Sequence, residues 1–235
     1  MKTATLPLAA LCGFLLLSGC EFDRVETGPT VSDPVSIDAG SADRAHVELN
    51  MRAGELKVSG GGTKLLEGTL EYNVPRWKPE VTSSHNGTHA SVTVQQPDTG
   101  GNFGHSHNVW DLQLANKTQL DLIINCGAGQ ARLELGDVKL RDLQVHIGVG
   151  QVDLDLSGKP TQDYEVRING GIGQANVHLP RDVGIWATAA GGIGSINITG
   201  LEKHGDHWEN DLYDKAKVNV RLDVKGGIGE VRLIG

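Results

Sequence analysis

Residues 120–135 read LDLIINCGAGQARLEL: an alternating apolar segment, a Gly-x-Gly step and a second alternating segment. Alternation with a period of two over short segments indicates half-buried β-strands. The same unit occurs five times, and its second glycine falls at Gly129, Gly150, Gly173, Gly194 and Gly229. The steps between these glycines are 21, 23, 21 and 35 residues. Such periods without helical patterning are typical of β-solenoids, in which stacked repeats bury one continuous core.

These repeats predict an all-β fold, a single-stranded parallel β-solenoid (β-helix) with equivalent residues about 4.8 Å apart in register. The residue between the glycines is apolar in every repeat, and we expect it to point inward as a ladder at a corner: Ala128, Val149, Ile172, Ile193 and Ile228. The residue after the second glycine is polar and is expected on the outside: Gln130, Gln151, Gln174, Ser195 and Glu230. Hydrogen-bonded stacking explains that outer ladder better than a binding stripe does.

The chain before the regular repeats divides into shorter pieces. Residues 20–43 carry turn residues without a sustained apolar period, which predicts a flexible linker. Residues 44–98 alternate but repeat poorly, as expected of an atypical N-terminal capping module, and a Gly/His loop at 99–108 separates them from solenoid repeats at 109–235. Because the chain stops directly after an apolar strand, the C-terminal rung is expected to leave an unpaired edge for self-association or a partner.

The N-terminus has the pattern of an export signal. Residues 1–19 combine a short basic start with an apolar stretch too short to span a bilayer. Leu17-Ser18-Gly19-Cys20 resembles the lipobox of bacterial lipoproteins, which predicts lipidation at Cys20 and a membrane contact through a lipid anchor. The predicted location is the bacterial cell envelope. In a cell with two membranes, Glu21 favours the periplasmic face of the outer membrane because it is not the aspartate linked with inner-membrane retention.

Composition and cysteine usage exclude several classes of protein. The formal net charge of -8 argues against nucleic-acid binding, which needs a basic surface. Cys12 leaves with the signal and Cys20 carries lipid, so Cys126 remains as a single buried thiol without a disulfide partner. No cofactor is expected, since the Gly-x-Gly steps lack the third glycine and the helix of a dinucleotide site.

The long step between Gly194 and Gly229 contains the one insertion of the repeat array, at residues 201–217. Insertions in solenoids map to one face, often the binding face. The candidate binding residues there are Trp208, Tyr213, His204 and His207, which would contact an envelope protein or glycan. The alternative is a loop whose aromatic rings fold back onto the sheet. We predict no metal site, because His105-Ser106-His107 in the Gly/His loop lacks an obvious third ligand. We also predict no catalytic residue and no enzyme activity, since no nucleophile motif or carboxylate cleft is evident.

Several stretches resemble bacterial toast-rack β-solenoid proteins. They are residues 66–75 (LEGTLEYNVP), Trp77-Lys78-Pro79, Trp110-Asp111-Leu112 and the Gly-Ala-Gly repeat at 127–129. That family includes the C-terminal domain of LiaF-like regulators of the cell-wall-active antibiotic response and many adhesin-like domains. The resemblance covers roughly residues 44–235 and implies a non-catalytic scaffold or interaction module. Two alternative functions remain. One is an envelope-stress sensor or accessory of the antibiotic-response regulator, and the other is a glycan-binding, adhesin-like module. LiaF-like members have membrane helices before the solenoid, where this chain has the predicted lipid anchor.

Overall fold

The computed structural model describes residues 26–98 and 106–235. Over these residues the chain forms thirteen strands and one short 3-10 helix, Pro75–Trp77. The strands are β1 (Val31–Ile37), β2 (Arg44–Gly62), β3 (Leu66–Tyr72), β4 (Glu80–Asn86), β5 (His89–Gln95), β6 (Asn108–Ala115), β7 (Gln119–Glu134), β8 (Leu140–Asp155), β9 (Tyr164–His178), β10 (Gly184–Thr199), β11 (Glu202–His204), β12 (His207–Glu209) and β13 (Asn219–Ile234).

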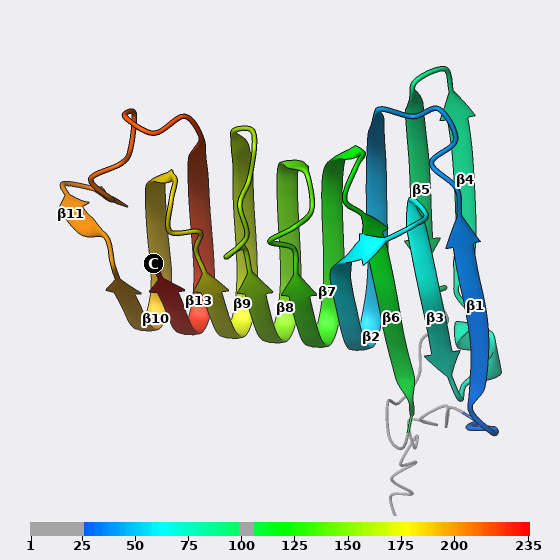
Figure 1. Cartoon of the computed structure of the whole chain (residues 1–235). Helices are drawn as coiled ribbons and strands as arrows, with labels where there is room; N and C mark the ends of the chain where they lie inside the picture. Colours follow the sequence, from blue (N-terminus) through cyan, green and yellow to red (C-terminus); the bar gives the residue numbers. More distant parts are fainter. Residues whose placement is uncertain (1–25, 99–105) are drawn as a thin grey trace, which may run out of the picture.

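Six long strands form the body of the molecule as a row of arches (Figure 1). Each arch is one strand, from β2, β7, β8, β9, β13 or β10, that bends in the middle into two legs. Neighbouring arches pair in parallel and in register, so that Gly129 lies opposite Gly150 and Gly150 opposite Gly173. The predicted all-β parallel solenoid is therefore confirmed, and the glycines mark the bends.

The bends require glycine because the backbones of successive arches approach closely there. Gly150 has a φ of 142°, and a Cβ built on it would lie 1.8 Å from the carbonyl oxygen of Gly129. No side chain can occupy that space, and few L residues adopt this conformation. The second glycine of each repeat thus fixes where the strand turns.

At the N-terminal end the two legs of β2 continue into separate layers. Its first leg pairs with β5, which pairs with β4, and its second leg pairs with β6, which pairs with β3 and then β1. The predicted module boundaries differ from the structure in two places. β2, predicted in the cap, pairs with the solenoid strand β7 from Arg44 to Ser59, and β6, predicted among the repeats, pairs with β2 and β3. The linker predicted at 20–43 is likewise wrong over Val31–Ile37, which forms β1.

A buried polar cluster joins the cap to the first arch. Asn108, at the start of β6, donates from Nδ2 to the carbonyl of Ala53 at 2.6 Å and to Gln96 Oε1 at 3.0 Å. Its Oδ1 accepts from the indole of Trp110 at 3.1 Å. Asn108 belongs to the predicted loop at 99–108, of which residues 99–105 lie outside the described residues.

The order of the arches differs from their order in the chain. The C-terminal strand β13 pairs in parallel with β9 on one side and with β10 on the other. The expectation that the C-terminal rung forms the open edge is wrong. The terminal arch of the stack is β10, which the chain completes before it returns to insert β13 (Figure 1). β13 lies between β9 and β10 because both strands offer it an apolar face in register. Strand pairing, and not order in the chain, therefore decides its place.

The core lies between the two legs of the arches. Leu122, Leu143 and Val166 are buried at equivalent positions, as their alternation predicts. Cys126 is buried with them, and burial raises the pKa of its thiol to about 11. The predicted inward ladder of residues between the glycines is wrong, because these side chains are largely exposed: Val149 52%, Ile172 51%, Ile228 49% and Ile193 70%. At the bend the backbone turns before their side chains can enter the core.

Candidate functional site at the free end of the stack

The insertion forms a small hairpin beside the terminal arch. Strands β11 and β12 pair antiparallel, and β12 pairs antiparallel with the first leg of β10. Figure 1 shows β11 beyond the terminal arch β10. The contact with β10 is short: Trp186 pairs with Glu209 and Ala187 with Trp208. The hairpin thus adds two short strands to the sheet at its free end.

Asn210 fixes this hairpin to β10. Its backbone N–H donates to the carbonyl of Ile185 at 3.2 Å, and its Oδ1 accepts from the N–H of Ile185 at 2.9 Å. Its Nδ2 donates to the carbonyl of Val183 at 2.8 Å. One side chain therefore satisfies backbone groups that a longer β12 would otherwise have paired.

The two predicted histidines come together on one face of the hairpin. His204 lies opposite His207, with ring centroids 6.2 Å apart, and His207 stacks on Trp186 of β10 at 5.3 Å. Glu209 lies beside both, 3.5 Å from His207 Nε2 and 4.0 Å from His204 Nε2. The hydrogen bond from His207 to Asp206 lowers the pKa of that carboxyl group.

The predicted aromatic residues lie elsewhere. The Nζ atom of Lys203 lies 5.1 Å from the ring centroid of Trp208, a cation–π contact. Trp208 follows His207 in a β-strand, so successive side chains point to opposite faces of the hairpin. Tyr213 is partly buried in the following turn, where its N–H donates to the carbonyl of Asn210 at 3.1 Å. The four predicted residues therefore do not form one site.

Trp186 is the residue of this surface that sequence reasoning missed. It is partly exposed, stacks on His207 and lies under Arg221, whose guanidinium carbon is 5.9 Å from the ring centroid. Its position in β10 indicates an outward side chain, but the sequence does not show that the hairpin folds back over it. We call Trp186, His204, His207 and Glu209 the hairpin face.

The hairpin face groups aromatic rings with charged side chains. Within residues 26–98 and 106–235, no three His, Cys, Asp or Glu side chains are placed to hold a metal ion. The face combines three stacked aromatic rings with a carboxylate and a nearby guanidinium, groups that can contact sugar rings or a protein surface. Cys20, the predicted lipidation site, lies outside the described residues.

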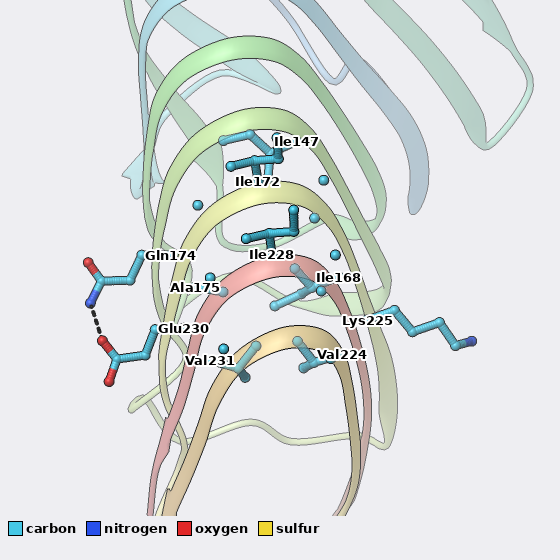
Figure 2. Close-up of a pocket in the computed structure, with 18 of the residues that line it drawn as sticks. Ile147, Ile168, Ile172, Gln174, Ala175, Val224, Lys225, Ile228, Glu230 and Val231 are labelled. Carbon is cyan, nitrogen blue, oxygen red and sulfur yellow. Dashed lines mark hydrogen bonds between the residues drawn. The ribbon is translucent and has the colours of Figure 1, made fainter.

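A second feature lies beneath the bends of the last arches. The inward position occupied by Cys126 and Ile147 in β7 and β8 is taken by Gly170, Gly226 and Gly191 in the following arches. These missing side chains leave an apolar hollow of about 70 Å³. Figure 2 shows Val224 and Val231 at this hollow, while Lys225 points away from it and Gln174 bonds Glu230 outside.

Models of known protein families match most of this chain. A family model described as the N-terminal domain of toast_rack, DUF2154, matches residues 26–178, well over half of the chain. The chain belongs to this toast-rack family. A second model, the C-terminal domain of LiaF of the cell wall-active antibiotics response, matches residues 128–233. The two matches overlap over β8 and β9, so the toast-rack stack continues through the arches that form the free end.

One solved structure has the same fold over most of its length. The chain is similar to a "putative cell adhesion protein" from Clostridium sporogenes ATCC 15579, with 29% identity and a TM-score of 0.85 over 87% of this chain and 99% of that one. Further matches are a "putative adhesin" from Bacteroides fragilis NCTC 9343 (8% identity, TM-score 0.32, 88% and 97% covered) and one from Parabacteroides merdae ATCC 43184 (12%, 0.28, 88% and 97%). No curated protein matches the chain in sequence. The part that the structure describes contains no helix able to span a membrane.

Proposed function

We propose that this toast-rack chain is a non-catalytic interaction module of the bacterial cell envelope, held there through Cys20. The observation that carries the proposal is its agreement with the Clostridium sporogenes protein, whose name refers to cell adhesion, over 87% of the chain. The LiaF-type match over residues 128–233 points to the same compartment, because its name refers to cell wall-active antibiotics. The stack of arches serves as a stiff support that holds the hairpin at its end.

The outer face of the arches supports a structural rather than a catalytic role. Asp153, one of the outward carboxylates, accepts hydrogen bonds from Gln151 at 2.7 Å and from Asn176 at 2.6 Å. Such amide-paired carboxylates stabilise stacked strands and lack the desolvated cleft of a general acid or base. The contacts of the module are therefore assigned to the hairpin, with an envelope protein or glycan as the partner.

Site-specific photocrosslinking tests this assignment. A photoreactive residue at Lys203, in β11, should capture a specific partner in native envelopes, whereas the same residue at Lys139, exposed in the β7–β8 loop, should not. Trp186→Ala, which removes the ring beneath His207, should weaken the Lys203 crosslink several-fold without loss of folded protein. Equal capture from both positions, or from neither, would contradict a role of the hairpin in binding.

Membrane attachment is tested separately. Cys20→Ser should release the protein from the membrane fraction, as judged by fractionation and by the loss of incorporated labelled fatty acid. Retention of the variant in the membrane fraction would contradict the lipid anchor, whatever the crosslinking shows.

A second candidate function is an envelope-stress sensor, favoured by the LiaF-type match. In a sensor, the partner captured at Lys203 would be a membrane regulator, and Trp186→Ala would change the output of that regulator at equal protein amount. In a scaffold, output would follow only the amount of protein.

A further inference from the structure

The terminal arch has an unpaired outer edge. β10 pairs with β13 on one side over its whole length, and on the other side with β12 at Trp186 and Ala187. Among the described residues, no strand pairs with the outer side of residues 188–199. Unpaired backbone N–H and C=O groups in such an edge are a template for another strand.

This edge lacks the usual protection against pairing. Residues 188–199 read TAAGGIGSINIT and contain no charged residue. The neighbouring strand β13 is paired on both sides and carries charged residues opposite this segment, namely Lys225, Glu230 and Arg232. The fold therefore accepts charges at the equivalent positions. The opposite end of the sheet is different, because the edge strand β1 contains Asp33 and Pro34. Charged residues and proline are devices that block edge pairing.

The core is also uncovered at this end. Ile196 is 37% exposed, although its neighbour in register, Val231, is 6% exposed. Ile193 at the bend is 70% exposed, the largest exposure among the bend residues between the glycines. Ile198 is partly buried, whereas its neighbour Leu233 is fully buried. A partner that extends the stack would cover Ile196 and Ile198. Ile193 would become about as exposed as Ile172, which lies between two paired arches and is 51% exposed.

The free edge is self-complementary. It comprises five residues of the first leg, 188–192, and five of the second, 195–199, on either side of Ile193 and Gly194. A two-fold axis through the bend places the first leg of one copy antiparallel to the second leg of the other. Inward residues then meet inward residues, with Gly191 opposite Ile196 and Ala189 opposite Ile198 of the second copy.

We propose that two copies of this chain associate through β10 to form a continuous twelve-arch stack. The hairpin ends at Ala187, where the paired segment would begin, so one copy's hairpin does not occupy the edge needed by the other. The interface is small, since two legs of five residues are each about 17 Å long. A small interface predicts a dissociation constant in the micromolar range, on the order of 10 µM.

Disulfide crosslinking of the full chain in mild detergent tests the proposal directly. Ile193→Cys places a thiol next to the two-fold axis, so mild oxidation should give a dimer band that reduction removes. Ile172→Cys is the matched control, because Ile172 is a half-exposed bend residue that lies between two paired arches. A dimer from both variants, or from neither, overturns the proposal.

Sedimentation of the full chain gives the second measurement. Wild type should be mostly dimer at about 100 µM, with about 80% of the chains paired at the expected dissociation constant. Ile196→Asp should weaken association at least tenfold, because its carboxylate would face the second copy's core unpaired. Ile172→Asp should leave association unchanged. A monomer at 100 µM, or larger open-ended oligomers, contradicts the two-fold edge. Because purified protein is used, failure here leaves the envelope crosslinking untouched.

Discussion

Two glycines three residues apart in β9 should respond in opposite ways to the same substitution. Gly173 has a φ of 148°, and a Cβ there would lie 1.7 Å from the carbonyl oxygen of Gly150. Gly170 faces the hollow, where the nearest atoms to a Cβ are Ile147 Cγ2 at 3.8 Å and the Lys225 carbonyl oxygen at 3.9 Å. Only Gly170 has room for a methyl group.

The expected magnitudes follow from this geometry. Gly173→Ala must displace the neighbouring backbone and adopt an unfavourable conformation, which costs about 3 kcal/mol or more. Gly170→Ala restricts the unfolded chain, worth about 0.4–1 kcal/mol, and buries a methyl group, worth about 0.8 kcal/mol. At about 2–4 °C per kcal/mol, the melting temperature should fall by at least about 6 °C in Gly173→Ala and rise by about 2–7 °C in Gly170→Ala.

Urea unfolding and calorimetry on both variants measure this contrast. The unfolding midpoints should move in opposite directions with unchanged slopes, and Gly226→Ala, at the equivalent hollow position of β13, should behave like Gly170→Ala. If Gly170→Ala destabilises the protein as strongly as Gly173→Ala, the hollow is not available space. If Gly173→Ala is tolerated, the close approach of the bends is not what selects glycine.

Four further perturbations test other parts of the structure. Asn210→Ala removes the side-chain bonds that hold the hairpin, so amide hydrogen exchange in residues 202–209 should accelerate about tenfold while β7 keeps its protection; equal loss in β7 would contradict local anchoring. Asn108→Leu leaves the buried indole N–H beside it unpaired and should lower the free energy of unfolding by about 2–4 kcal/mol in urea titrations, and a change below about 1 kcal/mol would refute its role. The Cys126 thiol should alkylate at least about 100-fold more slowly in the folded than in the unfolded protein at pH 8.5. Since folding raises its pKa from 9.0 to about 11, the associated stability is complete below pH 9 and is lost as the pH rises toward 11, and rapid labelling of folded protein would contradict its burial. Deletion of residues 201–235 removes β13 from between two arches and should abolish soluble, cooperatively folding protein, so a folded truncated chain would contradict the strand order.

Local rules in the sequence determined most of the fold. Each bend follows from a Gly-x-Gly step, because the backbones of adjacent arches leave no space for a Cβ atom there. The alternation of Leu122, Ile124 and their equivalents specified the buried face, and the recurring Gly-x-Gly step specified the parallel register. Each of these features can be recognised by comparing one repeat with the next, so a single sequence is enough to predict them.

The features that the sequence did not predict depend on contacts between segments that lie far apart in the chain. No local signal in β13 distinguishes a place beside β9 from a place at the end, since its apolar pattern fits either position. The bend residues such as Ile172 continue the alternation, so their exposure follows only from the three-dimensional turn. At the candidate site, His204 and His207 were found by composition, whereas their contact with Trp186 required knowing that the hairpin lies against β10.

The length of the connection between β10 and β13 argues that the hairpin has a purpose beyond linking them. The chain passes from β9 to β10 over the position that β13 later fills, and it uses only the five residues 179–183 to do so. The return from β10 to β13 uses the nineteen residues 200–218. Strand order alone therefore does not require the hairpin.

Protection of the edge does not explain the hairpin either. A hairpin that served only to hide β10 would cover the long uncharged segment at residues 188–199, but it pairs with Trp186 and Ala187 and stops. It instead presents two histidines and a carboxylate on a short extension of the sheet, while the self-complementary edge stays free. The two proposals together give the edge and the hairpin separate roles, in which the edge would join two copies and the two hairpins would contact an envelope partner.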